Sequence, residues 1–452
     1  MTTKVLLGLL AVTGFALSSL QAQILDVLYT FQHTNGSSPE CVLIQASDGS
    51  LYGTTHYGGP SATGFATGEG SVFKITTNGV WTPLHFFDTG TNGRYSYAGV
   101  LQATDGNFYG ATYRMPSAAS TIYRVTPEGT FATLVTLNPT TNGYFVRAAL
   151  IEGRDGNFYG TARSGGSNNL GTVFKMGTNR AVTTLSTFNG ANGAEPGGRL
   201  LQSSDGNFYG TTYLGGISNR GTVFRITTNG EFTTLISFTG TNGSRPYAGL
   251  IEGSDGNLYG TTSEGGSNSL GTIFRVTTNG TLTTLVTFGG TNGANPLSEL
   301  MIARDGSFYG TTSTMGEGNG GTVFQLTTNG QFTTLVALNG TTGYGSISGL
   351  MQGVDAALYG AARFGGPLNA GTLFRVAMPQ QTNSVSLTAR RSGDNLVVSW
   401  PTNAIGFILE FTFDLLPPIT WNLFSNSPAT IGSEFVITNS AASGMQFFRL
   451  RR

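Results

Sequence analysis

The chain has 452 residues, of which 23 are Lys or Arg and 23 are Asp or Glu, so its formal net charge is zero. Charged residues make up only 10% of the chain, which excludes both the basic footprint of a nucleic-acid-binding protein and the high charge of a disordered one. The 68 glycines are about twice the usual share of roughly 7% and indicate many tight turns between short strands. With Cys41 as its single cysteine, the chain cannot form an intrachain disulfide.

Residues 1–22 have the pattern of an export signal peptide. Lys4 precedes an apolar run from Val5 to Leu20, and Ala22 ends an imperfect cleavage site. The apolar run is short and broken by glycine, which favours a cleaved signal over the alternative, an uncleaved membrane anchor. We therefore expect an exported protein that is extracellular, at the cell surface or periplasmic, with no transmembrane segment in the mature chain.

Seven copies of one unit occupy residues 23–378. Each copy divides into four short strand patterns, with an Asp-Gly type turn after the first and, in most copies, an Asn-Gly turn after the third, which is the strongest short hairpin signal. The period is 50 residues except for the first gap, which is 57. This pattern predicts an all-β fold, a seven-bladed β-propeller. The repeated aspartates are Asp48, Asp105, Asp155, Asp205, Asp255, Asp305 and Asp355.

The two ends of the repeat region complement each other. The seventh copy lacks its fourth strand, and residues 24–31 match that strand in sequence. We expect this N-terminal strand to complete the last blade and close the ring, because closure removes exposed sheet edges. The alternative is an open solenoid.

Two aromatic positions recur in every copy and are expected to pack between neighbouring blades. Each buried ring contributes roughly 1.5–3 kcal/mol before ordering entropy is subtracted. The first position holds Tyr52, Tyr109, Tyr159, Tyr209, Tyr259, Tyr309 and Tyr359. The second holds Phe73, Tyr123, Phe174, Phe224, Phe274, Phe324 and Phe374.

The 50-residue period ends near Met378, and the rest of the chain is of another kind. Residues 379–383 are expected to form a linker, and residues 384–452 contain short β patterns that predict a small β-sandwich. The LVVSWP motif around Trp400 and the final FFRLRR resemble strands of a fibronectin type III-like domain. That resemblance implies spacing, anchoring or binding rather than catalysis.

The repeat itself resembles a known family. The motifs YGTT, Gly265-Gly266, GTIFRVTTNG and TLVTF are similar to the GloVer (Gloeo_Verruco) tandem repeat of exported bacterial proteins and, more loosely, to kelch repeats. The resemblance covers roughly residues 24–378. It implies export and a choice of C-terminal surface-attachment signals, and it implies no known chemistry.

Residues for catalysis or metal binding are sparse. The three histidines are His33, His56 and His85, all before the second blade, and no HExxH, CxxC or GxSxG motif occurs. A zinc site or a histidine-based triad is therefore poorly supported, and we expect no metal and no cofactor. The repeated aspartates precede glycine as ordinary turn residues, with calcium binding as the alternative.

Two columns of the repeat vary strongly on the loop face, which lies opposite the hairpin turns. Loops on a rigid scaffold carry recognition, although the alternative is ordinary drift among repeats. The column after YGTT holds His56, Tyr113, Arg163, Tyr213, Ser263, Ser313 and Arg363. The column before the first strand holds Glu40, Tyr97, Arg147, Gly197, Tyr247, Leu297 and Ile347, with Arg199 and Glu299 two residues beyond it. The candidate ligand-binding residues are Glu40, His56, Tyr97, Tyr113, Arg147, Arg163, Arg199, Tyr213, Tyr247, Glu299 and Arg363.

A further column is polar in six of the seven copies. We expect it to form a ring near the central channel, satisfied by backbone hydrogen bonds, with a channel ligand as the alternative. Its members are Gln45, Gln102, Glu152, Gln202, Glu252 and Gln352, and Ile302 breaks it.

These features together favour an exported, monomeric, non-enzymatic β-propeller that binds a glycan or a surface protein. Two alternatives remain. One is an extracellular carbohydrate-active hydrolase or lyase that uses Glu40, Glu264 or Glu299. The other is a purely structural surface protein.

Overall fold

The computed structural model describes residues 25–64, 66–90, 92–114, 119–378, 387–392, 395–401, 408–412, 422–423, 428–432, 434–440 and 447–451. The regular elements of these residues are all β-strands. The chain divides into two compact units, Met1–Met378 and Pro379–Arg452. The predicted signal peptide (1–22) and linker (379–383) lie outside the described residues.

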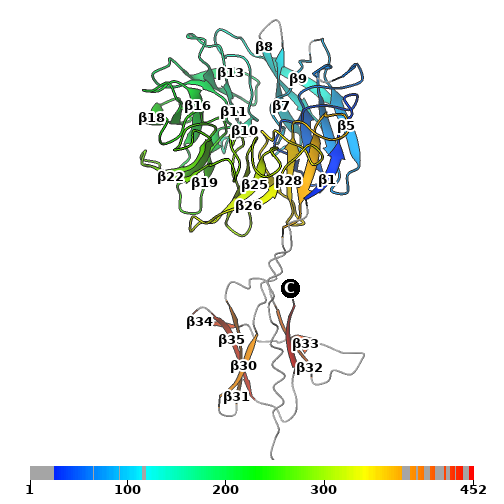
Figure 1. Ribbon diagram of the computed structural model, residues 1–452, viewed down its shortest axis with the longest axis vertical. Coiled ribbons are helices and arrows are strands. Elements are labelled where there is room, and N and C mark those ends of the chain that lie inside the picture. Colours follow the sequence, from blue (N-terminus) through cyan, green and yellow to red (C-terminus); the bar gives the residue numbers. More distant parts are fainter. Residues whose placement is uncertain are drawn as a thin grey trace, which may run out of the picture. The chain divides into compact units, whose positions relative to one another are not determined.

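The first unit is built from four-stranded antiparallel sheets, numbered 1 to 7 in chain order (Figure 1). Sheet 1 contains β2 (Ile44–Gln45), β3 (Leu51–Thr55), β4 (Ser71–Ile75) and β5 (Trp81–Phe86). Sheet 2 contains β6 (Leu101–Gln102), β7 (Phe108–Arg114), β8 (Ala119–Val125) and β9 (Phe131–Thr136). Sheet 3 contains β10 (Ile151–Glu152), β11 (Phe158–Ala162), β12 (Thr172–Met176) and β13 (Val182–Thr187).

The remaining sheets repeat this arrangement. Sheet 4 contains β15 (Leu201–Gln202), β16 (Phe208–Leu214), β17 (Thr222–Ile226) and β18 (Phe232–Ser237), and β14 (Ala194–Pro196) also pairs with β16. Sheet 5 contains β19 (Ile251–Glu252), β20 (Leu258–Thr262), β21 (Thr272–Val276) and β22 (Leu282–Thr287). Sheet 6 contains β23 (Met301–Ile302), β24 (Phe308–Thr311), β25 (Thr322–Leu326) and β26 (Phe332–Ala337). Sheet 7 contains β27 (Met351–Gln352), β28 (Leu358–Ala362), β29 (Thr372–Val376) and β1 (Leu25–Thr30).

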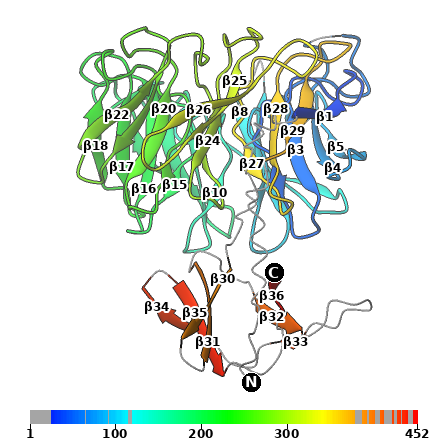
Figure 2. The ribbon, with the colours of Figure 1, turned by 60° about the horizontal axis from the view of Figure 1, so that its bottom comes forward.

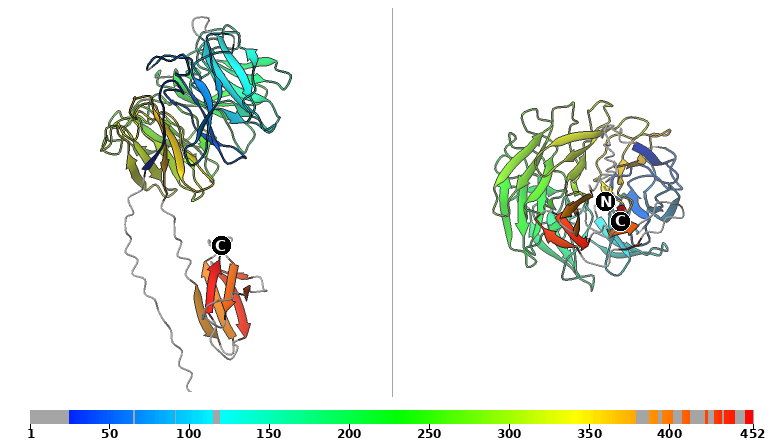
Figure 3. Two further views of the ribbon diagram at one scale, coloured as in Figure 1. Left: turned by 90° about the vertical axis from the view of Figure 1, so that its right-hand side faces the viewer. Right: turned by 90° about the horizontal axis from the view of Figure 1, so that it is seen from below.

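The sheets are arranged as in a β-propeller. Figure 2 shows β15, β16, β17 and β18 in that order from the inside of the unit outward, and the view from below in Figure 3 shows the sheets around a common centre. The two-residue first strands are innermost because the chain turns back there at the Asp-Gly turn. In these turns the aspartate Oδ1 accepts the backbone N–H two residues on, as Asp255 does from Asn257 at 3.1 Å.

The first strand of the chain supplies the strand missing from the last repeat. β1 pairs antiparallel with β29, with Leu25 opposite Val376 and Thr30 opposite Thr372. Sheet 7 therefore pairs a strand from the beginning of the first unit with a strand from its end. Val354 N–H in sheet 7 also donates to Gln45 Oε1 in sheet 1 at 2.8 Å, so the first and last sheets are directly bonded.

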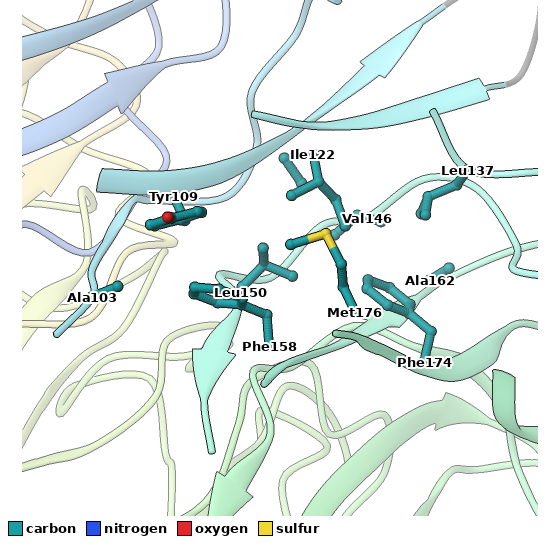
Figure 4. Close-up of a cluster of buried hydrophobic side chains, with 11 residues drawn as sticks. Ala103, Tyr109, Ile122, Leu137, Val146, Leu150, Phe158, Ala162, Phe174 and Met176 are labelled. Atoms are coloured by element: carbon teal, nitrogen blue, oxygen red, sulfur yellow. The ribbon is translucent and has the colours of Figure 1, made fainter. Parts of the chain in front are cut away.

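Aromatic and aliphatic side chains fill each seam between neighbouring sheets, as predicted. Figure 4 shows the seam between sheets 2 and 3, where Tyr109 and Ile122 from one sheet meet Phe158 and Met176 from the next. The Tyr109 and Phe158 ring centroids are 4.4 Å apart. The same stacking recurs for Tyr52 with Phe108, Tyr159 with Phe208 and Tyr259 with Phe308, at centroid distances of 4.1, 4.1 and 4.3 Å.

The tyrosine hydroxyls of this column have a structural partner. Each donates to Oδ2 of the turn aspartate four residues earlier, for example Tyr209 to Asp205 at 2.7 Å and Tyr159 to Asp155 at 2.8 Å. The phenol thus satisfies the only polar atom that the buried ring brings into the seam, and the aspartate holds the turn. The tyrosine column and the turn-aspartate column therefore both have a structural role.

The polar Gln and Glu column makes the backbone hydrogen bonds that were predicted, and at five of the seven seams these bonds tie a sheet to the preceding one. Each bond runs from a backbone N–H in the turn of one sheet to the side-chain oxygen of the next. The donors and acceptors are Val354 to Gln45, Thr104 to Glu152, Arg154 to Gln202, Ser204 to Glu252 and Arg304 to Gln352, all at 2.8–2.9 Å. Ile302 cannot accept such a bond, so the seam between sheets 5 and 6 lacks it. Gln102 donates to Gly106 O at 3.2 Å but accepts no backbone N–H from sheet 1 among the described residues, so the seam between sheets 1 and 2 lacks it too.

The second unit contains two sheets. One contains β30 (Thr388–Ser392), β31 (Asn395–Pro401), β35 (Glu434–Ser440) and β34 (Ala429–Ile431); the other contains β33 (Asn422–Leu423), β32 (Ile408–Thr412) and β36 (Phe447–Arg451). Trp400 and Ile437 of the first sheet share a buried cluster with Leu409 of the second.

Replacing Phe31, which follows β1, tests how firmly β1 holds sheet 7 to sheet 1. Phe31 is 1% exposed and its ring centroid lies 5.5 Å from that of Phe73. Phe238 occupies the equivalent place against Phe274 at 5.1 Å. We expect Phe31→Ala and Phe238→Ala each to lower the free energy of unfolding by about 3–5 kcal/mol in denaturant titrations, because each leaves a cavity in a seam. A cost below about 1 kcal/mol for Phe31→Ala alone would mean that β1 is dispensable.

Candidate functional site

A cavity of about 800 Å³ lies at the centre of the first unit. Its walls come from the first strands of the sheets and are largely apolar, with Ile44, Leu101, Leu201, Ile251 and Met351 among them. The cavity therefore runs along the axis around which the sheets are arranged. At its loop-face end the lining changes to polar and aromatic side chains, namely Glu40, Tyr97, Arg147, Arg199, Tyr247 and Glu299. We call these six residues the axial mouth.

The loops that carry the axial mouth share one backbone feature. In each repeat, the residue two positions before the column that precedes the first strand adopts a left-handed backbone conformation. Examples are Phe145, with φ +62°, and Arg245, with φ +57°. The carbonyl of this residue accepts the backbone N–H of the residue after the YGTT motif, as Phe145 does from Arg163 at 3.1 Å. The turn thus directs three variable side chains per repeat to one side of the ring. Non-glycine residues rarely adopt this left-handed conformation, and such residues cluster at functional sites.

Arg147 lies between two tyrosine rings. Its guanidinium carbon is 4.8 Å from the ring centroid of Tyr97 and 4.6 Å from that of Tyr247. The three residues precede sheets 3, 2 and 5, so this contact crosses the mouth of the cavity. Stacking on a ring face stabilises a guanidinium by about 0.5–2 kcal/mol and leaves the N–H groups at its edge available.

A second contact also joins loops of non-neighbouring sheets. Arg199 Nη2 and Glu299 Oε1 are 3.2 Å apart, and these residues lie in the loops before sheets 4 and 6. Both side chains line the cavity. The pair neutralises two of the four ionised groups of the axial mouth, which leaves Glu40 and Arg147.

Glu40 is a buried carboxylate at the same mouth. Its side chain is 2% exposed, and neither carboxylate oxygen accepts a hydrogen bond within the described part of the chain. Arg363 Nε lies 3.0 Å from Oε1, as an ion pair without hydrogen-bond geometry. Burial raises the pKa of Glu40, and the positive charges of Arg363 and Arg147 oppose that rise.

His56 packs against Tyr97 and Tyr57, with ring centroids 3.7 and 4.0 Å apart. Burial lowers the pKa of His56 to about 3, with further lowering by Arg363 and Arg147. The imidazole is therefore neutral at physiological pH. Its Nδ1 has no hydrogen-bond partner among the described residues.

The remaining predicted residues lie outside the cavity lining. Arg163 Nη2 and Glu195 Oε2 are 2.6 Å apart, and the guanidinium of Arg163 lies 5.2 Å from the ring centroid of Tyr213. Tyr213 contacts Tyr247 edge to face at 5.9 Å. Tyr113 stacks on Phe145 at 4.7 Å and reaches Tyr97 only through that ring.

The structure thus brings all eleven predicted residues to one face, six of them at the cavity and five behind it. Sequence reasoning missed the left-handed column between the other two, which holds Tyr95, Phe145, Glu195 and Arg245. These residues supply ring and ion-pair partners to the predicted set, for example Arg245 to Glu264 at 2.6 Å. The signal was present in the sequence, because this column varies as strongly as the one two residues later.

The described residues contain no group of three or more His, Cys, Asp or Glu side chains that could hold a metal ion. In that same part of the chain no helix is long and apolar enough to span a membrane.

Repeated four-stranded sheets around an axial cavity, with the variable residues confined to one rim, define a repeat-built β-propeller. The family model of the Gloeobacter/Verrucomicrobia repeat matches residues 61–254 and 237–397, which is more than half of the chain. The chain belongs to this repeat family. No curated protein matches its sequence.

Solved structures are similar in fold at low sequence identity. A protein described as the extracellular domain of a hybrid two-component system from B. thetaiotaomicron is 12% identical, with a TM-score of 0.51 over 95% of this chain and 55% of that one. The chain thus spans about half the length of that protein. The β-propeller domain of the Trilobed protease from Pyrococcus furiosus is 10% identical, with a TM-score of 0.45 over 77% of this chain and 95% of that one. Puromycin hydrolase is 12% identical, with a TM-score of 0.47 over 82% and 59%.

The low pKa of His56 predicts a pH dependence of stability. The unfolded chain takes up a proton at His56 below about pH 6.5 while the folded chain does not, so stability is lost as pH falls. Between pH 7 and pH 5 this group alone lowers the free energy of unfolding by about 2 kcal/mol. Denaturant titrations should show that His56→Phe loses about 2 kcal/mol less than the wild type over this range. Equal losses in the two proteins would show that His56 ionises normally in the fold.

Proposed function

We propose that the chain is an exported, closed seven-bladed β-propeller that binds a glycan at the axial mouth. The bonds of sheet 7 to β1 and to Gln45 support closure of the ring. The signal-like residues 1–22 and the repeat family support export to the cell surface, the periplasm or the medium. The second unit, with Trp400 in a two-sheet core, is proposed as a fibronectin type III-like domain for anchoring or spacing.

The observation that carries the binding function is the convergence of Glu40, Arg147, Tyr97 and Tyr247 at the end of one apolar cavity. Ligand sites are concave, mostly apolar and marked by a few polar groups that fix orientation. A purely structural role would not require a buried carboxylate whose oxygens accept no hydrogen bond, because such a group costs stability. The arrangement therefore favours a ligand that supplies hydrogen-bond donors.

Retention of the mature protein, from Gln23 onward, on a panel of soluble and insoluble polysaccharides tests this function. We expect binding that falls at least about tenfold in Tyr97→Ala and Tyr247→Ala, because either change removes a ring that holds Arg147. The matched control is Tyr144→Ala, since Tyr144 lies on the same loop face, bonded to Asn169, and does not line the cavity. Equal losses in all three variants, or retention on no polysaccharide, would contradict the proposal.

A second candidate function, hydrolysis or elimination in a polysaccharide, has one supporting observation. Burial raises the pKa of Glu40, which is the property of a general acid. Glycoside hydrolysis needs a second carboxyl group besides that of Glu40. The two other predicted acids, Glu264 and Glu299, are each ion-paired to an arginine, which makes them weaker candidates for that second group.

Product analysis separates binding from catalysis. We expect no new reducing ends or unsaturated products after long incubation of the wild type with any polysaccharide it retains. Release of products that stops in Glu40→Gln and continues in Glu264→Gln would replace the binding function with the enzymatic one.

A further inference from the structure

Arg147 is the one group of the axial mouth whose charge is not matched by a close ion pair. Arg199 pairs with Glu299, and Glu40 pairs with Arg363 from outside the cavity lining. Within the described residues, Arg147 has no carboxylate within 4.0 Å and contacts aromatic rings instead. The six residues of the axial mouth sum to zero charge, and with Arg363 counted beside them three arginines face two glutamates, so this end of the cavity carries one surplus positive charge, which attracts an anionic group.

The stacking of Arg147 determines what kind of anion fits. The Tyr97 and Tyr247 rings both contact the guanidinium, and such contacts reduce the side-chain entropy that Arg147 would lose on binding a ligand. A planar guanidinium presents its donors in a fork that matches a carboxylate through two parallel hydrogen bonds. The aromatic rings also exclude water from the guanidinium faces and so strengthen such a contact.

Glu40 favours hydrogen-bond donors, rather than a second anionic group, on the same ligand. It belongs to the cavity lining, and its carboxylate is nearly fully buried and accepts no hydrogen bond among the described residues. A second anion beside it would be repelled, whereas neutral hydroxyl groups would donate to its oxygens. A ligand that satisfies both residues carries one carboxylate and several hydroxyls on one small body.

We propose that the axial mouth binds a uronate residue of an acidic polysaccharide, with the sugar carboxylate on Arg147 and sugar hydroxyls on Glu40. This inference rests on the glycan-binding function proposed above and names its substrate class. The polymer enters from the loop face, where Arg199 and Glu299 border the same opening. The Asp-Gly rim takes no part, because its aspartates are bonded to the scaffold tyrosines.

Calorimetric titration with polyuronates tests the proposal. The probes are oligomers of polygalacturonate, alginate and glucuronan, each compared with its own carboxyl-reduced form, in which the carboxylate is replaced by a hydroxymethyl group. At least one uronate oligomer should bind about tenfold or more tightly than its reduced form, because the bond to Arg147 is charge-assisted. Arg147→Met should remove that preference, and Arg147→Lys should keep only part of it, because an ammonium lacks the fork.

Two further variants complete the design. Glu40→Gln should weaken binding of the uronate and of its reduced form alike, because the amide offers one acceptor where the carboxylate offers two. Arg220→Gln is the matched control, since Arg220 lies on the loop face, bonded to Ser244 and away from the cavity lining, and should bind as the wild type does. Thermal unfolding of each variant establishes that it is folded.

The outcomes separate this inference from the function on which it rests. Equal binding of a uronate polymer and its reduced form would overturn the inference and leave glycan binding standing. A preference for uronate that survives in Arg147→Met would place the carboxylate elsewhere and would also overturn it. Binding of no oligomer, together with no retention on neutral polysaccharides, would overturn both.

Discussion

The packing of aromatic rings between neighbouring sheets is the constraint on which the rest of the structure depends. A four-stranded sheet with a two-residue first strand cannot bury its own Tyr and Phe columns, so each sheet is stable only beside another. The rule applies at every seam, from Tyr109 on Phe158 to Phe31 on Phe73. The last sheet must therefore meet the first, and β1 gives it a complete outer edge there.

Most of the polar side chains that recur from repeat to repeat are hydrogen-bonded within the scaffold. The turn aspartates accept hydrogen bonds from the buried tyrosines, and the Gln and Glu column accepts backbone N–H groups across the seams. The variable side chains of the loop face take no part in these recurring scaffold bonds, and it is there that the repeats differ in charged and aromatic residues. Function on a repeated scaffold must come from such differences, and here they meet at one end of one cavity.

The sequence allowed the strands, their order and the completing role of residues 24–31 to be predicted, because turn residues and alternation repeat with a fixed period. It also located the two variable columns, since their position in the repeat determines which face they occupy. It could not show that Tyr97 and Tyr247 hold Arg147, or that Arg199 pairs with Glu299, because these contacts join repeats 50 to 100 residues apart. The sequence placed Tyr97 and Tyr247 among the candidate ligand-binding residues; in the structure both rings contact the guanidinium of Arg147. The variation of the left-handed column was visible in the sequence, but its backbone conformation could not be predicted because it follows no sequence motif.

The most direct test of the central claim is a crystal structure of the mature protein with a bound uronate oligomer. The account predicts a sugar carboxylate within hydrogen-bond distance of the Arg147 guanidinium and a hydroxyl of the same residue on Glu40, with Tyr97 and Tyr247 unmoved. A sugar bound at the Asp-Gly rim or on the second unit, with Arg147 and Glu40 untouched, would contradict it.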